Sequence, residues 1–187
     1  MEATLPFTDS MKAEEFFAFT DTRPDEERWE LLDGIPVLNP SPSYLHQIVL
    51  RNLTVLLFAL ERDTDRAWTA VPGFGLRVTE NNVPVPDLLV RPNTLLHAQD
   101  CEDAIVAFEI LSPSTAHRDR RWKRTAYAHL PSLQHYVIVA QDSANALSYE
   151  RRDGFAERRI AGPAASLALP SLGVELALTD IYQDTGL

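Results

Sequence analysis

The sequence is poor in several features that define protein classes. Cys101 is the only cysteine among the 187 residues, which excludes an internal disulfide and any thiolate-rich zinc cluster. A bound metal would therefore have oxygen or histidine ligands. The longest uninterrupted apolar run, Val55–Leu60, is far shorter than the roughly 18 to 20 residues that a membrane-spanning helix needs. Because no basic stretch leads into an apolar segment at the N-terminus, we expect no secretion signal, no membrane association and a cytoplasmic location.

Positive charge is scarce as well. The 17 Lys and Arg residues are outnumbered by 27 Asp and Glu residues, and the net charge of −10 argues against a nucleic-acid partner, since such proteins usually expose a basic surface. The average hides an asymmetry, because nine of the 17 basic residues lie between positions 117 and 159. Four arginines there could contact a phosphate backbone or form an ordinary salt-bridged surface: Arg118, Arg120, Arg121 and Arg124.

Length and composition predict a single domain over residues 1–187 with a sizeable core. Helices are predicted over Met11–Phe19, Ser43–Arg62 and His117–His129 from the spacing of apolar residues and the end signals. Asp33-Gly34 and Asp153-Gly154 predict two tight hairpin turns. Strands are predicted at Arg28–Leu32, Ile35–Leu38, Ala67–Ala70, Phe74–Val78, Val83–Val90, Ala104–Leu111, His135–Ala140, Leu147–Arg151 and Phe155–Ile160, with short strand or loop over Leu167–Leu178. Together they predict an α/β fold with a mixed β-sheet flanked by helices, an N-terminal hairpin and extra C-terminal strands.

Two carboxylates fall at apolar positions of predicted strands. Alternation places Asp87 with Val83, Val85 and Leu89, and it places Glu109 among the aliphatic residues of its strand. A buried, unpaired carboxylate costs several kcal/mol, so each must be paired, metal-bound or protonated. Asp87 could instead end an edge strand, and Glu109 could form a structural salt bridge.

On the following helix, Asp119, Lys123 and Tyr127 recur at spacings of four residues and share one face. An Asp119–Lys123 surface ion pair is the plain interpretation. If this helix packs on the face that carries Asp87 and Glu109, two carboxylates and an ammonium converge instead. Such a site suits phosphodiester hydrolysis with magnesium or manganese, which prefer oxygen ligands.

Several motifs extend this interpretation. Glu30-Leu31-Leu32-Asp33-Gly34, Pro86-Asp87 and Glu109-Ile110-Leu111-Ser112-Pro113-Ser114-Thr115 occur in order, together with His46, Lys123 and Tyr127. From about Glu14 to Asp180 the chain resembles the Uma-two family of restriction-endonuclease-like proteins, within the PD-(D/E)XK nuclease superfamily.

The resemblance implies a restriction-endonuclease-like core that depends on magnesium or manganese. It implies that Asp87 and Glu109 bind the metal, with the carbonyl of Ile110 as a further ligand. Leu111 stands where the superfamily's lysine usually lies, and the resemblance implies that Lys123 on the next helix replaces it. Because many nucleases of this superfamily cut duplexes as dimers, the resemblance also implies a homodimer acting on DNA.

Two further residues have competing interpretations. Glu30 shares a strand face with Arg28 and could pair with an arginine, whereas the resemblance implies an auxiliary catalytic role. His46 continues the apolar stripe of its helix, which favours a hydrogen-bonded core histidine, whereas its position in the family pattern implies a contact to phosphate or metal.

The sequence thus predicts a metal-dependent endonuclease with Asp87, Glu109, Lys123 and Glu30 at its catalytic centre. Two alternatives stay open. One is a catalytically inactive nuclease-fold module that binds nucleic acid or protein in a regulatory role, which the acidic net charge favours. The other is a phosphoesterase that acts on a substrate smaller than DNA.

Overall fold

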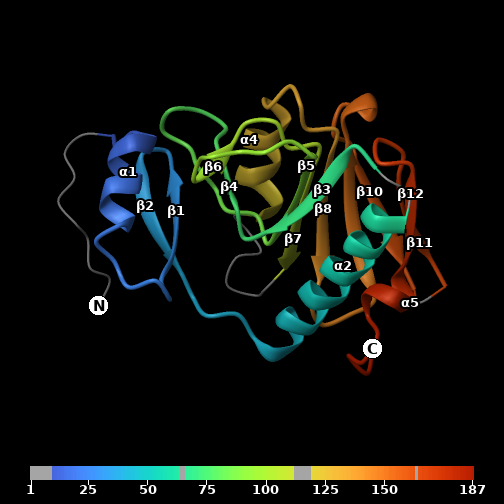
Figure 1. Ribbon diagram of the computed structural model, residues 1–187. Coiled ribbons are helices and arrows are strands. Elements are labelled where there is room, and N and C mark those ends of the chain that lie inside the picture. The colour runs from blue at the N-terminus through green and yellow to red at the C-terminus, as the bar shows by residue number, and fades with distance from the viewer. Residues whose placement is uncertain (1–9, 64–65, 112–118, 163) are drawn as a thin grey trace.

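A computed structural model describes residues 10–63, 66–111, 119–162 and 164–187 of the chain. Its centre is a six-stranded sheet in the order β10-β9-β8-β7-β5-β3, in which only β7 and β8 are parallel. The helix α1 and the β1-β2 hairpin lie to one side of this sheet (Figure 1). The mixed α/β fold with an N-terminal hairpin and additional C-terminal strands is thereby confirmed.

The helices are α1 (Ala13–Thr20), α2 (Tyr44–Asp63), α4 (Arg124–Ala128) and α5 (Leu178–Ile181), and a π-helical turn, Asp119–Lys123, leads into α4. The strands are β1 (Arg28–Leu32), β2 (Ile35–Asn39), β3 (Trp68–Pro72), β4 (Gly75–Leu76), β5 (Leu88–Pro92), β6 (Asp100–Cys101), β7 (Val106–Leu111), β8 (His135–Ala140), β9 (Asn145–Glu150), β10 (Glu157–Ala161), β11 (Ser166–Leu169) and β12 (Val174–Ala177). The N-terminal part of the predicted 117–129 helix lies outside the described residues. None of the described helices has the length and apolar character needed to cross a bilayer.

Helix α2 covers one face of the sheet. Val49, Leu53 and Leu57 are fully buried against Phe108 and Val137 of the central strands, as the leucine periodicity predicts. The β11-β12 hairpin and α5 extend the same core. These C-terminal elements resolve the predicted strand or loop over 167–178 into two strands and the start of a helix.

The opposite face of the sheet is covered by α4. Tyr127 of this helix packs edge-on against Tyr136 of β8, with ring centroids 5.0 Å apart. Tyr136 in turn stacks on Tyr149 of β9 at 5.7 Å. Glu109 and Ala107 point to this face of β7, because Phe108 and Ile110 belong to the core under α2. The crossover between the parallel strands β7 and β8 therefore places α4 directly over Glu109.

The first predicted hairpin is confirmed, and the second differs. Asp33 and Gly34 have φ angles of 51° and 75°, as a two-residue type I′ turn requires. Around Asp153-Gly154 the chain instead forms a 3₁₀ turn, Arg151–Asp153, before Gly154 at φ 63°. The connection between β9 and β10 is longer than two residues, so the register of these strands differs from the one that a tight turn would give.

The prediction of a strand over 83–90 is wrong in its first half. Pro84 and Pro86 lack the N–H groups that a sheet ladder uses, and β5 begins only at Leu88. Val83 pairs with Leu31 of the N-terminal hairpin instead, through backbone hydrogen bonds of 3.1 and 2.8 Å. This segment therefore ties the hairpin to the central sheet and places Asp87 at the junction.

Candidate active site

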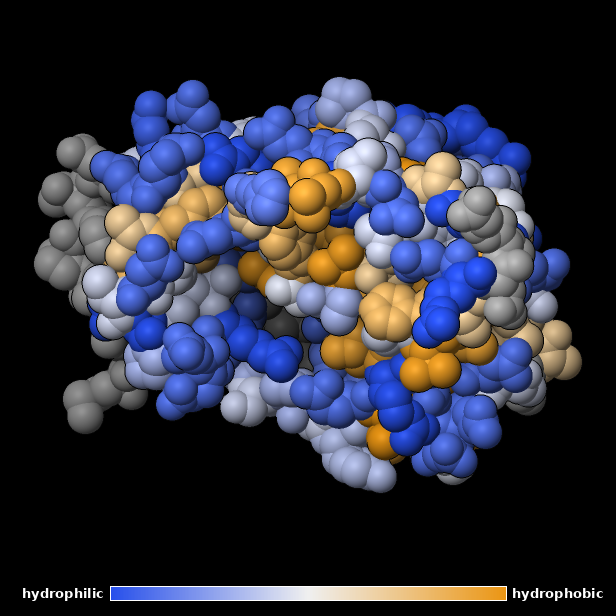
Figure 2. Space-filling model, in the orientation of Figure 1, coloured by the Kyte–Doolittle hydropathy of each residue, from blue (hydrophilic) through white to orange (hydrophobic). Residues whose placement is uncertain are grey.

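A cavity of about 970 Å³ lies where the hairpin, the start of α2, the start of β5 and the end of β7 meet. In Figure 2 the molecular surface is hollowed between the N-terminal part and the rest of the chain. Five residues singled out in the sequence line this cavity: His46, Asp87, Glu109, Ile110 and Lys123. The fold thus brings together side chains that are up to 77 positions apart in the sequence.

Asp87 and Glu109 reach the cavity from neighbouring strands. The register of β5 and β7 pairs Leu88 with Phe108, and continuing it by one residue sets Asp87 opposite Glu109. The ladder ends there, and the Asp87 side chain takes its place: Oδ2 accepts a hydrogen bond of 2.7 Å from the N–H of Ile110. The carboxylate is thereby held at the end of the strand, with 17% of its side chain exposed.

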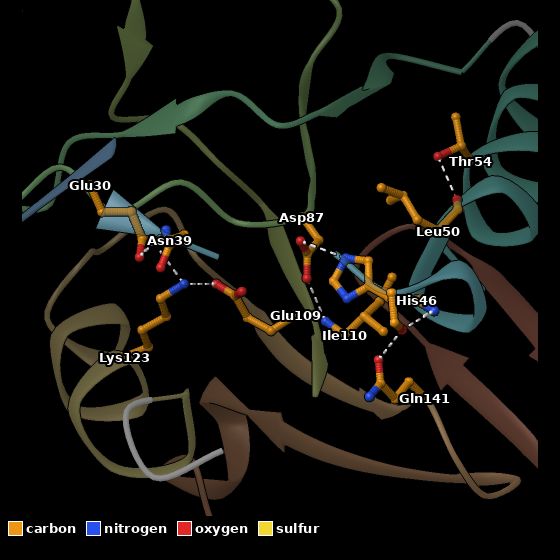
Figure 3. A network of polar contacts seen from close by, with 11 residues as sticks. Glu30, Asn39, His46, Leu50, Thr54, Asp87, Glu109, Ile110, Lys123 and Gln141 are labelled. Atoms are coloured by element: carbon orange, nitrogen blue, oxygen red, sulfur yellow. Dashed lines mark hydrogen bonds and ion pairs between the residues drawn. The ribbon is translucent and has the colours of Figure 1, made fainter. Parts of the chain in front are cut away.

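Lys123 lies between two carboxylates in the interior. Its Nζ is 2.7 Å from Oε1 of Glu109 and 2.8 Å from Oε1 of Glu30 (Figure 3). The exposed fractions are 2% for Lys123, 4% for Glu109 and 0% for Glu30. Burying charges costs several kcal/mol each unless partners are well placed, so such a cluster indicates function more than stability.

The position of Lys123 follows from the local helix geometry. It is the last residue of the π-helical turn, directly before α4. Single π-turns within helices are rare and occur frequently at functional sites. The predicted face shared by Lys123 and Tyr127 is confirmed, because both side chains contact Glu109. The side chain of Asp119 lies outside the described part, so its pairing with Lys123 stays a prediction.

Glu30 is positioned by the hairpin and by the segment that precedes β5. Its Oε1 accepts a hydrogen bond of 2.8 Å from the N–H of Val85, and its Oε2 accepts one of 2.9 Å from Nδ2 of Asn39. These contacts and Lys123 surround a carboxylate that is fully buried. Asn39, on the partner strand of the hairpin, carried no signal in the sequence, because its contact with Glu30 follows from how the hairpin packs.

Tyr127 binds the same oxygen of Glu109 as Lys123 does. Its hydroxyl donates a hydrogen bond of 3.1 Å to Oε1. Burial raises the pKa of Tyr127 well above its usual value, and the charge of Glu109 raises it further. The phenol therefore keeps its proton at physiological pH and acts as a hydrogen-bond donor to Glu109.

Removing this donor is expected to destabilise the fold. We expect Tyr127→Phe to lower the free energy of unfolding by about 1.5–3 kcal/mol, the range for hydrogen bonds to charged groups. Urea denaturation measures the change. Tyr44→Phe is the matched control, because the Tyr44 side chain is 76% exposed. Equal midpoints for the two variants would show that the contact with Glu109 contributes nothing.

His46 borders Asp87 from the first turn of α2. Its Nε2 lies 3.2 Å from Oδ1 of Asp87, an ion-pair distance, yet this atom makes no hydrogen bond with the described residues. The backbone N–H of His46 donates to Oγ of Ser43 at 3.2 Å, and Ser43 donates to Oε1 of Gln141 at 2.9 Å. The α2 stripe thus ends in a polar residue that lines the cavity, and its ring nitrogen lacks the hydrogen bond expected of a core histidine.

The predicted basic cluster lies apart from these residues where it is described. Arg121 is exposed, and Arg124 stacks over the ring of Tyr149 at 5.0 Å. Neither belongs to the described residues that line the cavity. Arg118 and the side chain of Arg120 lie outside the described part of the chain, as does the Ser112–Thr115 turn.

Two arginines outside the predicted basic cluster line the cavity. Arg23 and Arg28 are both exposed, and they belong to the segment between α1 and the end of β1. Their segment is strongly acidic, so their charge does not stand out in the sequence. Only the docking of the hairpin beside the sheet shows their proximity to Asp87 and Glu109.

Comparisons with known proteins agree with this architecture. The Uma2 family model, described as "Putative restriction endonuclease", matches residues 13–179. The crystal structure of a "putative nuclease belonging to DUF820" from Anabaena variabilis superposes with a TM-score of 0.74 at 17% identity, covering 92% of this chain and 97% of that one. An uncharacterised protein of Synechocystis sp. is 34% identical over 110 residues, which is 57% of either chain. The family model spans nearly the whole sequence, and the chain belongs to the Uma2 family.

Proposed function

We propose that this chain is a metal-dependent endonuclease that hydrolyses the phosphodiester bonds of nucleic acid, DNA in the first instance. In this proposal Asp87 and Glu109 bind Mg²⁺ or Mn²⁺ with the carbonyl of Ile110, and Lys123 is the catalytic lysine. The observation that carries the proposal is that Asp87, Glu109 and Lys123 line one cavity, with Lys123 Nζ 2.7 Å from Glu109. Membership of the Uma2 family supports it.

The residues present fit a hard divalent cation. Asp87 and Glu109 offer carboxylate oxygens, each of which can accept more than the contacts already described. The described residues contain no group of three or more acidic, histidine or cysteine side chains arranged as a metal cage. Mg²⁺ does not require one, because it usually binds one or two carboxylates and completes its shell with waters and substrate phosphates.

In this proposal the metal ion, Lys123 and His46 each have a separate role in phosphodiester hydrolysis. A bound Mg²⁺ supplies polarisation of a phosphoryl oxygen and a lower pKa for its water. The Lys123 ammonium, fixed by Glu30 and Glu109, offsets negative charge that develops on the phosphate. His46, whose buried Nε2 lies 3.2 Å from Oδ1 of Asp87 and makes no hydrogen bond with the described residues, contacts the phosphate or an attached water.

Metal binding is tested first, because a binding module without catalysis would lack it. We expect Mg²⁺ and Mn²⁺ to raise the melting temperature, since a ligand at a hundred times its Kd adds about 2.7 kcal/mol of stability. Asp87→Asn should remove this shift. Asp184→Asn should keep it, because Asp184 pairs with Arg51 at the surface and is not among the described residues that line the cavity.

Cleavage is tested in parallel on single-stranded and duplex DNA, RNA and small nucleotide esters, with each metal and with chelator. Metal-dependent cutting of a polynucleotide is the expected result. Binding of nucleic acid that persists in chelator, without cleavage under any divalent ion, would contradict the proposal and favour the inactive binding module. Cleavage of the small esters alone would favour the phosphoesterase.

A further inference from the structure

The cavity also constrains the substrate. Glu109 and Lys123 line it with 4% exposure or less, and the Asp87 side chain, which also lines it, is 17% exposed. A phosphodiester must therefore enter the cavity to reach these groups. At about 970 Å³ the cavity is at the upper end of the range typical of small-ligand sites. A duplex is a stiff rod that cannot fold one phosphate inward without deformation, whereas a single strand bends freely.

The charge of the cavity also favours a single strand over a duplex. Among the described residues that line it, five are Asp or Glu and three are Arg or Lys. One of the three, Lys123, is already bound to two carboxylates. Proteins that bind duplexes gain most of their affinity from basic side chains that neutralise many phosphates. The described lining residues cannot neutralise many phosphates, so the affinity for a nucleic acid must come from contacts with its bases.

Aromatic side chains offer such contacts. Phe17, Trp29 and Phe74 line the cavity, and each is half-buried. Trp29 is held in place: its Nε1 donates a hydrogen bond of 2.8 Å to Glu27, and its ring meets that of Phe19 edge-on at 5.1 Å. A fixed aromatic ring beside exposed arginines is the usual platform on which unpaired bases stack. Arg28, its neighbour in β1, lines the cavity as well.

We propose that the site takes single-stranded nucleic acid, with a base stacked on Trp29 while the adjoining phosphodiester reaches Asp87 and Glu109. This inference rests on the proposed nuclease function for the role of the acids, but binding of the strand can be measured without cleavage.

The test is fluorescence anisotropy in EDTA at one fixed low salt concentration, with a labelled 12-nucleotide strand and the duplex of the same sequence. We expect the single strand to bind at least about ten-fold more tightly than the duplex. Trp29→Leu, which stays apolar but loses its aromatic face, should weaken single-strand binding about ten-fold, within the range measured for base stacking. Trp29→Phe should stay close to the unsubstituted protein.

The control is Phe58→Leu, because Phe58 is a 42% exposed aromatic on α2 that does not line the cavity. Unchanged melting temperatures verify that the Trp29 variants are folded. Equal or tighter duplex binding would overturn the inference, as would a Trp29→Leu variant that binds the strand normally or a mononucleotide that competes as well as the 12-mer. Selective strand binding without metal-dependent cleavage would support this inference and contradict the nuclease proposal. Preferential cleavage of the duplex would support the nuclease proposal and contradict this inference.

Discussion

Replacing Lys123 with methionine is expected to lower the free energy of unfolding by about 3–5 kcal/mol, the cost of removing one partner from a buried ion pair. Lys123 is 2% exposed and lies within 2.8 Å of both Glu30 and Glu109. Methionine keeps most of the side-chain volume but leaves two buried carboxylates without this ammonium. Urea denaturation at pH 7, with fluorescence as the signal, measures the loss.

The chain contains a matched control for this experiment. Lys12 is the only other lysine, and it pairs with Glu80 at 3.0 Å with its side chain 59% exposed. Lys12→Met should leave the denaturation midpoint unchanged, because exposed ion pairs contribute little. A Lys123→Met variant as stable as Lys12→Met would contradict the interpretation of Lys123 as a buried, charge-compensating group.

A double variant separates lost charge from lost packing. If stranded carboxylates cause the instability, adding Glu30→Gln to Lys123→Met should recover part of the stability, because an amide is cheaper to bury than an ionised carboxylate. Poorer packing of methionine would predict further loss instead. Whether the double variant is more or less stable than Lys123→Met alone therefore identifies the cause.

Glu109→Gln is expected to reduce metal-dependent cleavage at least about a hundred-fold, since a bound metal contributes several kcal/mol to stabilisation of the transition state. Glutamine keeps the shape of the side chain and its carbonyl oxygen can still accept from Tyr127. It loses the negative charge that would bind both the cation and Lys123. The initial cleavage rate at saturating Mg²⁺ measures the effect.

Glu175→Gln on the exposed face of β12 is the comparison for this variant, and its rate should equal that of the unsubstituted protein. Thermal unfolding must show that Glu109→Gln remains folded at the assay temperature, because the substitution also alters the Lys123 cluster. A folded Glu109→Gln variant that cleaves at a rate within about three-fold of the unsubstituted protein would remove Glu109 from the proposed metal site.

The buried cluster relates the two experiments. Glu30, Glu109 and Lys123 are charged groups in the interior, where apolar residues of similar volume are often as stabilising or more so. A sequence selected for stability alone has little reason to place them there. Their retention beside the cavity fits a site in which part of the folding stability is given up for chemistry.

Elements set by local patterns were predictable from the sequence. The leucine stripe identified α2, Asp33-Gly34 identified the first hairpin, and the apolar run at His135–Ala140 matched β8 in full. In each case the deciding signal lies within a few residues, as helix periodicity and turn chemistry require. The late start of β5 had such a signal too, since Pro84 and Pro86 both weaken a strand.

By itself, the sequence determined which elements form and which unusual charges they carry, because periodicity and turn residues act over short distances. It marked Asp87, Glu109 and Lys123 as candidates from their spacing and their family pattern. Only the tertiary structure decided that Glu30, which also accepts a hydrogen bond from Asn39, reaches from the hairpin to Lys123, and that Trp29 and Arg28 line the cavity. Those contacts depend on how separately folded segments pack against each other, and no local repeat in the sequence encodes that packing.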